Sequence, residues 1–460
     1  MIISLAPDGN IIIAGSSQNV EGDFDYEIIK YKPNGDEAWR ARYASPNQGN
    51  DQLRGMAIDP SGNVVVTGTS DTVKYSSAGV LKWSVQLPGR AVIANANFIY
   101  VTGFSDIDIA TAQLENNDVD GHELWRRLID GRNHGPDIGE AIALDSSGNV
   151  YVAGQEEFQP CSIVCWRIFA AVSYSPTGTQ RWFGHAAVGD SPATQPGNAA
   201  EANSIIVAND GGLFVYGTYA PGSAILMKFD SNGGLVWGDS LFAETGTKMI
   251  FDVTTSSFLA TGSGYDSGVY PYPDPAFIDG FAQDGSESHK RIWTYFGPNG
   301  GHNIGTDIGQ DSSGNIFVTG HSPNDASSEA LFLAKISRQG QQLGLDRYNS
   351  PNGGSSFGNA MVIDSQGNAY VTGYTVNTQG GSEFVTIKYS AAPKIEKKPS
   401  GAVHIEFHTT PGQQYAIEGT SDFFNWQPLI TNTADANGLL QFDDTDAPTI
   451  PYRFYRGKQP

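Results

Sequence analysis

Basic residues, cysteines and long apolar runs are scarce in this 460-residue sequence. Two cysteines, Cys161 and Cys165, allow at most one disulfide within the chain. No stretch approaches the roughly 18–20 apolar residues of a transmembrane helix, so no membrane span is expected. The start, MIISLAPDGN, lacks a charged segment, a long apolar run and a small-residue cleavage site, and is therefore not a signal peptide. We expect Met1 to be a mature start or a truncation of a longer secreted precursor.

Lys and Arg total 27 against 49 Asp and Glu, which gives a net charge of −22. Such an acidic surface repels phosphate backbones, so nucleic acid is not an expected partner. Divalent cations, cationic ligands and plain solubility are all compatible with it. The sequence also lacks a G-x-S-x-G motif, a phosphate-cradling glycine motif and an H-E-x-x-H motif, so no motif indicates a catalytic class.

Glycine, in contrast, is abundant, with 55 residues beside 24 prolines. Because there is no collagen period, this composition indicates many tight turns and hence many short strands. Hydrophobic residues make up 39% and aromatic residues 11% of the chain, which is enough for a sizeable core.

A segment of the form D-x-x-G-N-hydrophobic-x-V-x-G recurs along the chain. Five clear copies end at Gly15, Gly68, Gly154, Gly320 and Gly373. Three weaker copies end at Gly103, Gly217 and Gly262, which makes eight units. The units follow one another roughly every 50 residues, a spacing typical of propeller blades. Within a unit, the alternation of apolar and polar residues and the Gly-containing turns predict four antiparallel strands.

Six units carry a tryptophan at the matching place of the fourth strand: Trp39, Trp83, Trp125, Trp182, Trp237 and Trp293. We expect these rings to pack one sheet against the next. The seventh unit, QQLGLDRY at 341–348, has no such tryptophan, and the eighth shows three strands, the last within 384–390. A four-stranded sheet cannot bury both faces alone, whereas eight sheets arranged radially can. The prediction is an all-β chain: an eight-bladed β-propeller over 1–392, its last unit incomplete, and a small C-terminal β-sandwich over 393–460.

The segments DSSGNVYVAG and DSQGNAYVTG, each followed by a strand like FVTIKYS, resemble the SBBP-type bacterial β-propeller repeat. The resemblance implies an exported bacterial protein, secreted or at the cell surface, and brings no catalytic motif with it. In addition, KFDSNGGLVW (228–237) is similar to the turn before the Trp of quinoprotein dehydrogenase repeats. Those enzymes have adjacent cysteines and a calcium site, whereas the two cysteines here are not adjacent.

The last part of the chain, with PGQQYAIEGTSDFFNW, FDDTDAP and YRFYR, resembles a C-terminal module of exported proteins from Verrucomicrobia and related bacteria. The strand and turn pattern and this resemblance together imply an immunoglobulin- or fibronectin-like β-sandwich. Trp426 and Tyr415 are expected in its core, with carbohydrate binding as the alternative.

Function is expected on the face of the disc that carries the second-to-third and fourth-to-first loops. These loops vary in length, whereas the turns on the other face are tight. Two are long, residues 156–166 and 265–280. The first contains Cys161 and Cys165. We predict a disulfide there rather than a zinc site, which would need two further ligands.

The innermost strands begin with polar residues that would line the mouth of a central channel. Such a ring suits a hydrated channel that holds a small polar ligand, and it equally suits solvation of a water-filled hole. The predicted ring consists of Arg54, Glu140, Asn203, Lys248, Thr306 and Asn359.

Histidines and carboxylates from different blades fall on the same face. If they converge, they can hold zinc, calcium or another divalent ion and activate water; otherwise they are unrelated loop residues. The candidate ligands are His134, Asp137, His302, Asp307 and His321, with His185 and Asp190 in the same set of loops. Residues 116–123, NNDVDGHE, resemble the start of a calcium loop. Arg127 stands where the closing Glu is needed, so we predict a turn.

Two functions stay open at this point. The first is an exported monomeric scaffold that binds a small polar ligand, a glycan or a protein through the long-loop face or the channel. The second is a metal-dependent hydrolase of broad specificity that acts on an ester, lactone or phosphoester. Three or more of the histidine and carboxylate candidates within ligand distance of one point would favour the enzyme.

Overall fold

A computed structural model describes residues 1–46, 49–132, 134–159, 166–186, 200–219, 223–241, 244–252, 255–264, 274–285, 290–298, 300–324, 328–351, 353–378, 380–389, 394–408, 414–421, 425–435, 439–449 and 453–458. Over these residues the chain consists of strands in antiparallel sheets, with one short 3-10 helix, η1 (Ala447–Thr449). The predicted all-β class is confirmed. The chain divides into two compact units, residues 1–296 with 300–308 and residues 297–299 with 309–460.

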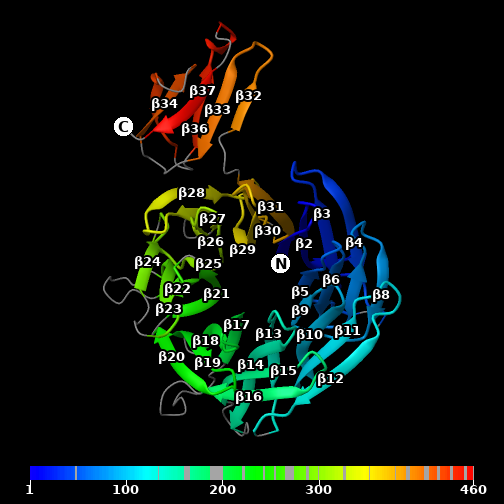
Figure 1. Cartoon of the computed structure of the whole chain (residues 1–460). Helices are drawn as coiled ribbons and strands as arrows, with labels where there is room; N and C mark the ends of the chain where they lie inside the picture. Colours follow the sequence, from blue (N-terminus) through cyan, green and yellow to red (C-terminus); the bar gives the residue numbers. More distant parts are fainter. Residues whose placement is uncertain are drawn as a thin grey trace. The chain divides into compact units, whose positions relative to one another are not determined.

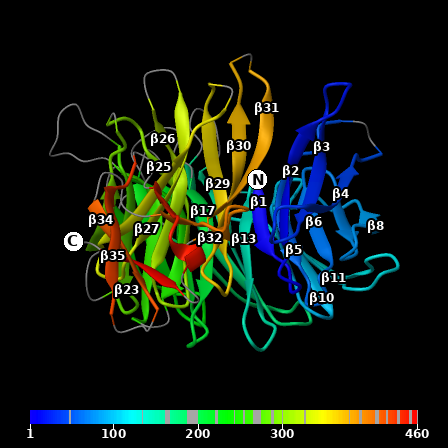
Figure 2. The ribbon, with the colours of Figure 1, turned by 90° about the horizontal axis from the view of Figure 1, so that it is seen from above.

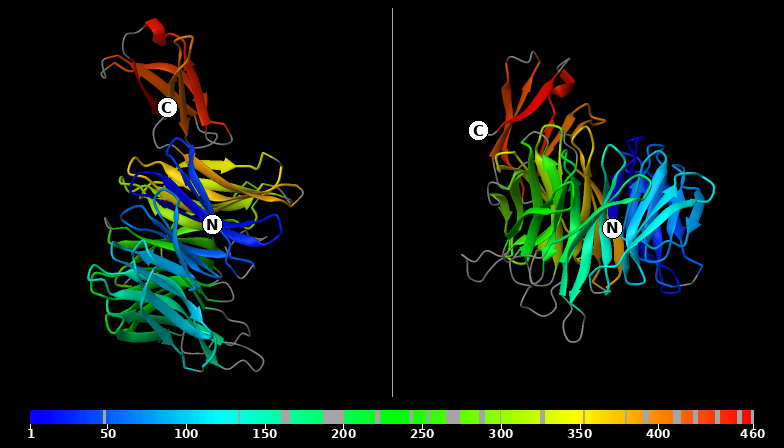
Figure 3. Two further views of the ribbon diagram at one scale, coloured as in Figure 1. Left: turned by 90° about the vertical axis from the view of Figure 1, so that its right-hand side faces the viewer. Right: turned by 60° about the horizontal axis from the view of Figure 1, so that its bottom comes forward.

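The first unit contains six consecutive four-stranded sheets, here called sheets 1 to 6, each a meander of four successive strands. Figure 1 shows them fanned beside one another, with the first strands on the inner side and the fourth strands on the outer side. Figures 2 and 3 show from other directions that sheets 1 to 3, in blue to cyan, lie side by side in chain order. The strands are β1 (Ile2–Leu5), β2 (Ile11–Gln18), β3 (Phe24–Tyr31) and β4 (Glu37–Tyr43) in sheet 1; β5 (Leu53–Ile58), β6 (Val64–Gly68), β7 (Thr72–Tyr75) and β8 (Leu81–Val85) in sheet 2; β9 (Ala91–Ala94), β10 (Phe98–Ser105), β11 (Asp108–Glu115) and β12 (Glu123–Ile129) in sheet 3; β13 (Ile138–Leu144), β14 (Val150–Gln159), β15 (Trp166–Tyr174) and β16 (Gln180–Ala186) in sheet 4; β17 (Ala200–Val207), β18 (Leu213–Tyr219), β19 (Ser223–Phe229) and β20 (Leu235–Leu241) in sheet 5; and β21 (Glu244–Asp252), β22 (Ser257–Gly264), β23 (Ala276–Ala282) and β24 (Lys290–Tyr295) in sheet 6.

The D-x-x-G-N part of the repeat forms the turn between the first and second strands. In sheet 2, Asp59 Oδ1 accepts hydrogen bonds from the backbone N–H groups of Ser61 and Asn63, both at 2.9 Å, and Asn63 Nδ2 donates to Asp59 Oδ2 at 2.8 Å. Gly62 has a φ of +82°, which glycine adopts without steric cost. The motif residues are therefore turn residues, because an Asp at this position organises the backbone that follows it.

Each of five tryptophans lies on the turn glycine of the next sheet. Trp83 is an example, since a Cβ on Gly121 would lie 2.8 Å from its ring, and Trp83 Nε1 donates to the Asn117 carbonyl at 3.0 Å. The pairs in the first unit are Trp39–Gly79, Trp83–Gly121, Trp125–Gly178, Trp182–Gly233 and Trp237–Gly285. The predicted role of the rings in packing sheet on sheet is confirmed at these junctions.

Apolar side chains of the central strands fill the space between neighbouring sheets. Between sheets 1 and 2, for example, Ile12 and Ile28 pack in one buried cluster with Val64 and Val73. β-branched residues suit such strands because they pack well on a pleated surface.

The second unit contains most of sheet 7, all of sheet 8 and two further sheets. Phe317, Leu331 and Leu333 of sheet 7 pack against Met361 and Val371 of sheet 8. In the described part of the chain sheet 8 has three strands, as predicted. The strands are β25 (Ile304–Gln310), β26 (Ile316–Pro323), β27 (Glu329–Ile336) and β28 (Gln342–Tyr348) in sheet 7; β29 (Ser356–Ile363), β30 (Ala369–Val376) and β31 (Ser382–Tyr389) in sheet 8; and, in the last two sheets, β32 (Lys394–Lys397) with β33 (Val403–His408) and β36 (Leu439–Asp444), and β35 (Gln427–Thr433) with β34 (Gln414–Thr420) and β37 (Phe454–Lys458).

Candidate functional site

The predicted channel-mouth residues stand at a recurring irregularity of the first strand. In sheets 2, 4, 5, 6 and 8 this strand carries one extra residue opposite the second strand, which is a β-bulge. Bulges bend a strand and re-aim a side chain, and they are common beside functional sites. The bulged residues are Arg54, Glu140, Asn203, Thr247 and Asn359.

Four of the six predicted ring residues are therefore bulged residues. In sheet 6 the bulge falls on Thr247, and the predicted Lys248 is the next residue of β21, where it is exposed. Thr306 lies half-buried in β25. In sheet 8, Asn359 is half-buried, and its side-chain oxygen has no hydrogen-bond partner among the residues described.

The bulge also explains the glycine that closes the repeat in these five sheets. A Cβ on Gly154 would lie 1.9 Å from the carbonyl oxygen of Ile138, so no other residue fits there. Equivalent carbonyl oxygens lie 1.8–2.0 Å from such an atom at the closing glycines of the other bulged sheets: Gly68, Gly217, Gly262 and Gly373. The conserved pattern within this chain thus records a close approach of two backbones.

Three bulged side chains connect their sheet to the next one. Glu140 Oε2 accepts a hydrogen bond from the Ala202 N–H at 2.7 Å, and Asn203 Nδ2 donates to the Gly246 carbonyl at 2.7 Å. Thr247 Oγ1 donates to the Gly305 carbonyl at 2.6 Å. In each case the partner is the backbone of the residue directly before the equivalent position in the following sheet. These bulged residues are therefore inter-sheet clamps.

Arg54 and Arg90 depart from this arrangement. Arg90 of sheet 3 is equivalent in position to Arg54 of sheet 2. The residue after each arginine pairs with the threonine before the repeat glycine: Gly55 with Thr67, and Ala91 with Thr102. Sequence reasoning missed Arg90, although its place before the third repeat was the available signal. Over the residues that the structure covers, neither guanidinium lies in an ion pair, and the buried Nε of Arg90 has no hydrogen-bond partner.

A cavity of about 110 Å³ lies between sheets 2 and 3 at this point. Its lining combines both arginines with backbone from the ends of β6 and the approach to β9: Arg54, Gly68, Thr69, Pro88, Gly89, Arg90 and Phe104. A water molecule needs only about 10–15 Å³ of such space, so the cavity has room for a larger group. Burial and the charge of Arg90 lower the pKa of Arg54. The lining residues lie at the strand ends that carry the second-to-third and fourth-to-first loops, where function was predicted from the sequence.

The predicted metal ligands are held by other partners. His134 lies against Asp130, and His302 Nδ1 lies 2.7 Å from Asp274 Oδ2. Asp137 accepts hydrogen bonds from the N–H groups of Gly131 at 2.5 Å and Glu157 at 2.9 Å.

His321 packs edge-on against the Phe357 ring, with the ring centroids 5.0 Å apart, and Asp307 Oδ1 accepts from the Ile308 N–H at 2.9 Å. Within the described ranges no group of three His, Cys, Asp or Glu side chains is placed to hold a metal ion. The zinc or calcium site stays a prediction.

A second polar group lies near the end of β14 and was not predicted. Glu156 is 0% exposed, and its Oε1 lies 3.7 Å from Arg132 Nε and 3.8 Å from His185 Nδ1. Neither oxygen of Glu156 has a hydrogen-bond partner among the described residues. Burial raises the pKa of Glu156 to about 7, and burial together with the Arg132 charge lowers the pKa of His185. The position follows the repeat glycine, but nothing in its local pattern signals burial.

Some predictions lie outside the described residues. These are the disulfide between Cys161 and Cys165, the place of Asp190, and most of the two long loops, 156–166 and 265–280.

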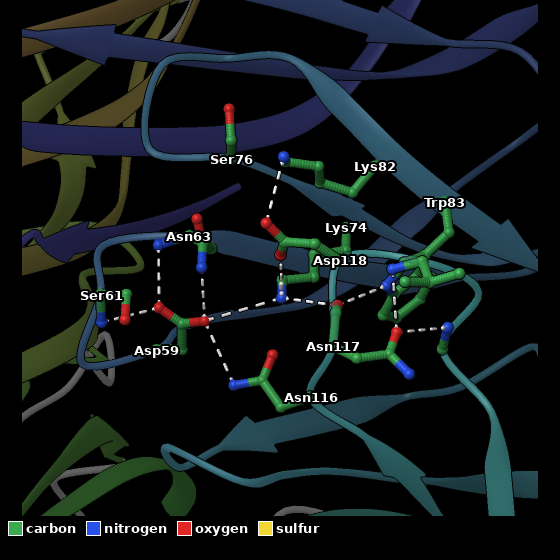
Figure 4. Close-up of polar contacts among 12 residues, drawn as sticks. Asp59, Ser61, Asn63, Lys74, Ser76, Lys82, Trp83, Asn116, Asn117 and Asp118 are labelled. Carbon is green, nitrogen blue, oxygen red and sulfur yellow. Dashed lines mark hydrogen bonds and ion pairs between the residues drawn. The ribbon is translucent and has the colours of Figure 1, made fainter.

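The opposite ends of the strands carry a polar network with a structural role. Figure 4 shows the fully buried Lys74 of β7, whose Nζ lies 2.9 Å from Asp118 Oδ1 and 4.0 Å from Asp59 Oδ2 and donates to the Asn117 carbonyl at 2.8 Å. Asn117 Oδ1 accepts the N–H groups of residues 119–121. The calcium-like segment 116–123 is therefore a turn, as predicted.

The comparisons with known proteins concern the repeat and the fold. Residues 341–378 match the family model described as "Beta-propeller repeat" (SBBP). No curated protein matches the sequence. The residues described include no helix long and apolar enough to cross a membrane.

Solved structures with a similar arrangement are distant in sequence. The C-terminal WD40 domain of Sif2 is 9% identical, with 68% of this chain and 80% of that chain covered and a TM-score of 0.43. The Pan2 WD40 domain of Neurospora crassa is 9% identical, with 85% and 89% covered and a TM-score of 0.42. PorZ, a surface component of the type-IX secretion system of Porphyromonas gingivalis, is 10% identical, with 95% and 72% covered and a TM-score of 0.37. The chain is thus an all-β protein with a β-propeller repeat of the SBBP type at residues 341–378.

Proposed function

We propose that this chain is a binding scaffold whose ligand enters the cavity between sheets 2 and 3. The observation that carries this proposal is the cavity itself, which lies where strands of sheets 2 and 3 meet their loops and contains a buried donor, Arg90 Nε, without an acceptor in the described structure. Buried polar groups are almost always hydrogen-bonded, so an unsatisfied donor in a cavity is the kind of group that a ligand completes.

The test is a thermal-shift screen of small polar ligands and glycans, with hits measured by calorimetry. Thr69→Tyr would fill the cavity from its exposed rim, whereas Val119→Tyr adds the same ring on the exposed turn between β11 and β12. A ligand of the cavity binds the wild type and Val119→Tyr equally and loses at least tenfold in affinity in Thr69→Tyr. A screen without hits, or hits that Thr69→Tyr leaves unchanged, would contradict the proposal.

We also propose that the eight sheets form one closed eight-bladed propeller, that the last two sheets form a sandwich, and that the protein works outside the cell. The recurrence of one junction through sheets 1 to 6 supports the ring. The extracellular location rests on the resemblance of the repeats to those of exported bacterial proteins. An electron-microscopy reconstruction of the full chain tests the ring, since an open arc would be visible.

One observation favours the second candidate, a hydrolase. A buried carboxyl with a pKa near 7, such as Glu156 beside His185, suits general acid–base catalysis. A panel of esters, lactones and phosphoesters, assayed with and without chelator, tests it, because Glu156→Gln must abolish any turnover that depends on this group.

A further inference from the structure

The two arginines of the cavity form an uncompensated pair of positive charges. In the described structure no Asp or Glu lies within ion-pair distance of Arg54 or Arg90. Glu140 acts on Arg90 electrostatically, but both of its oxygens already accept hydrogen bonds, from Gln155 Nε2 at 3.0 Å and from the Ala202 N–H at 2.7 Å. Burial, and after it the charge of Arg90, lowers the pKa of Arg54, and the second cause is the repulsion between the two groups.

Several other basic side chains of the first unit have a hydrogen-bond partner. Some pair with carboxylates, for example Lys30 with Asp8 at 2.7 Å and Arg42 with Asp25 at 2.7 Å. Arg127, Arg167 and Arg181 donate to uncharged oxygens instead. Three equivalent bulged residues bond to the neighbouring sheet, whereas Arg54 and Arg90 make no such bond to any residue that the structure describes. The described part of the fold therefore holds two guanidinium groups together at some cost and supplies no ion-pair partner for them.

The chemistry of the guanidinium defines the missing partner. Arginine presents a planar set of N–H donors that matches the oxygens of a carboxylate or a phosphate, and hydrogen bonds between charged groups are among the strongest. The cavity of about 110 Å³ leaves room for such a group, and the exposed ring of Phe104 offers an apolar surface for the carrier beside it.

We propose that the cavity between sheets 2 and 3 is an oxyanion site, in which Arg54 and Arg90 together bind the carboxylate or phosphate of a small ligand. This inference rests on the proposed function and specifies its ligand. The anion offsets the repulsion between the arginines and supplies the acceptor that Arg90 Nε lacks.

The experiment measures binding of inorganic phosphate, glucose 6-phosphate, glucuronate and neutral glucose by calorimetry at low salt. The variants are Arg54→Gln, Arg90→Gln and the double variant. The control is Arg126→Gln, which removes the same charge from the exposed pair with Glu123. Circular dichroism confirms that each variant is folded.

We expect the phosphates, glucuronate or both to bind the wild type and Arg126→Gln, to bind each single variant at least tenfold more weakly, and not to bind the double variant. Binding of phosphate alone or glucuronate alone identifies the oxyanion. Raising the salt to about 0.5 M weakens binding at least tenfold, because screening is strong there. Without ligand, Arg54→Gln raises the melting temperature, because one of two repelling charges is gone.

Equal binding of the anions to the wild type and to the double variant would overturn the inference, as would a failure of all three anions to bind. A neutral ligand that binds the cavity and is lost in Thr69→Tyr but kept in the double variant would leave the binding scaffold standing without the oxyanion site. The two proposals therefore fail separately.

Discussion

At the residue scale, buried carboxyl groups set how the protein responds to pH. Glu156 is inaccessible to solvent and Glu140 is half-buried, and burial raises the pKa of each to about 7. The folded state then binds more protons than the unfolded chain between about pH 4.5 and pH 7. The contribution of these two protonated carboxyl groups to the free energy of unfolding is complete below pH 4.5 and is lost as the pH rises through 7.

Glu156→Gln replaces the acid with a neutral amide of the same shape. We expect the variant to match the wild type near pH 4.5 and to exceed its free energy of unfolding by up to about 3 kcal/mol at pH 8. Urea unfolding at both pH values measures this difference. Glu21→Gln, on an exposed turn, is the control and leaves the pH dependence unchanged. Parallel pH profiles for Glu156→Gln and wild type would show that Glu156 is not proton-linked to folding.

At the element scale, sheets 4 and 5 are each attached to the next sheet at both ends of their strands. The loop end has the bulged side chains, and the turn end has the tryptophans and the buried lysines. Lys74 illustrates the turn end, since its ammonium lies between Asp59 of its own sheet and Asp118 of sheet 3. Lys30 makes a similar connection, since its Nζ lies 2.7 Å from Asp8 of its own sheet and donates to the Ser77 carbonyl of sheet 2 at 3.2 Å.

Lys74→Met keeps the length of the side chain and removes its charge. Because the change leaves the buried Asp59 without its cation, we expect a loss of about 3 kcal/mol in the free energy of unfolding. Lys82 is a more exposed partner of Asp118, with its Nζ 3.1 Å from Asp118 Oδ2. Lys82→Met should therefore lower the free energy of unfolding by under about 1 kcal/mol. Denaturant unfolding of both variants checks the order, and equal losses would contradict a special role of the buried lysine.

Gly154→Ala tests the close approach at the bulge. A Cβ there would lie 1.9 Å from the Ile138 carbonyl, so the strands must separate locally, and we expect a loss of about 2–4 kcal/mol. Gly344→Ala in β28 is the matched control, because an added Cβ meets nothing within 4 Å. Thermal unfolding of the two variants should therefore differ clearly, and a tolerated Gly154→Ala would mean that the bulge can relax.

The repeat made the elements predictable to a large extent. The Asp of the turn, the alternating strand residues and the tryptophan all carry local signals, and the strands lie where these signals occur. The bulge was not predicted, because its signature is a glycine on the opposite strand, which reads equally as a turn or a strand end. This is why Lys248 was chosen where Thr247 is the bulged residue.

The candidate site was predictable only in part. Arg54 was identified from its place in the repeat, whereas Arg90 precedes a weaker copy of the repeat and was not predicted. The cavity and the buried state of Glu156 depend on how neighbouring sheets pack, and no local pattern encodes that. The proposed metal ligands share a face by topology, but their bonds to nearby residues come from individual loop conformations.

At the scale of the whole molecule, charge determines how the chain responds to salt. With 49 acidic and 27 basic residues, repulsion among carboxylates opposes folding. Raising NaCl from about 0.01 M to about 0.1 M shortens the screening length from about 30 Å to about 10 Å. We expect the urea midpoint to rise over this range, while anion binding at the cavity weakens. Sucrose at matched osmolality is the control, and a falling midpoint would mean that ion pairs such as Lys74 with Asp118 dominate the response to salt.

The contacts between successive sheets have a consequence for how such a chain can grow. In the first unit five tryptophans contact a glycine of the following sheet, and three clamp side chains bond to the backbone of the following sheet. A repeat with both features therefore has matching contact residues at its two edges. A tandem copy of one repeat, produced by gene duplication, would carry the contact residues of both edges. It could therefore pack between its neighbours without compensating changes. Repeats can therefore be gained singly, and individual copies are free to lose the motif and acquire side chains such as the two cavity arginines.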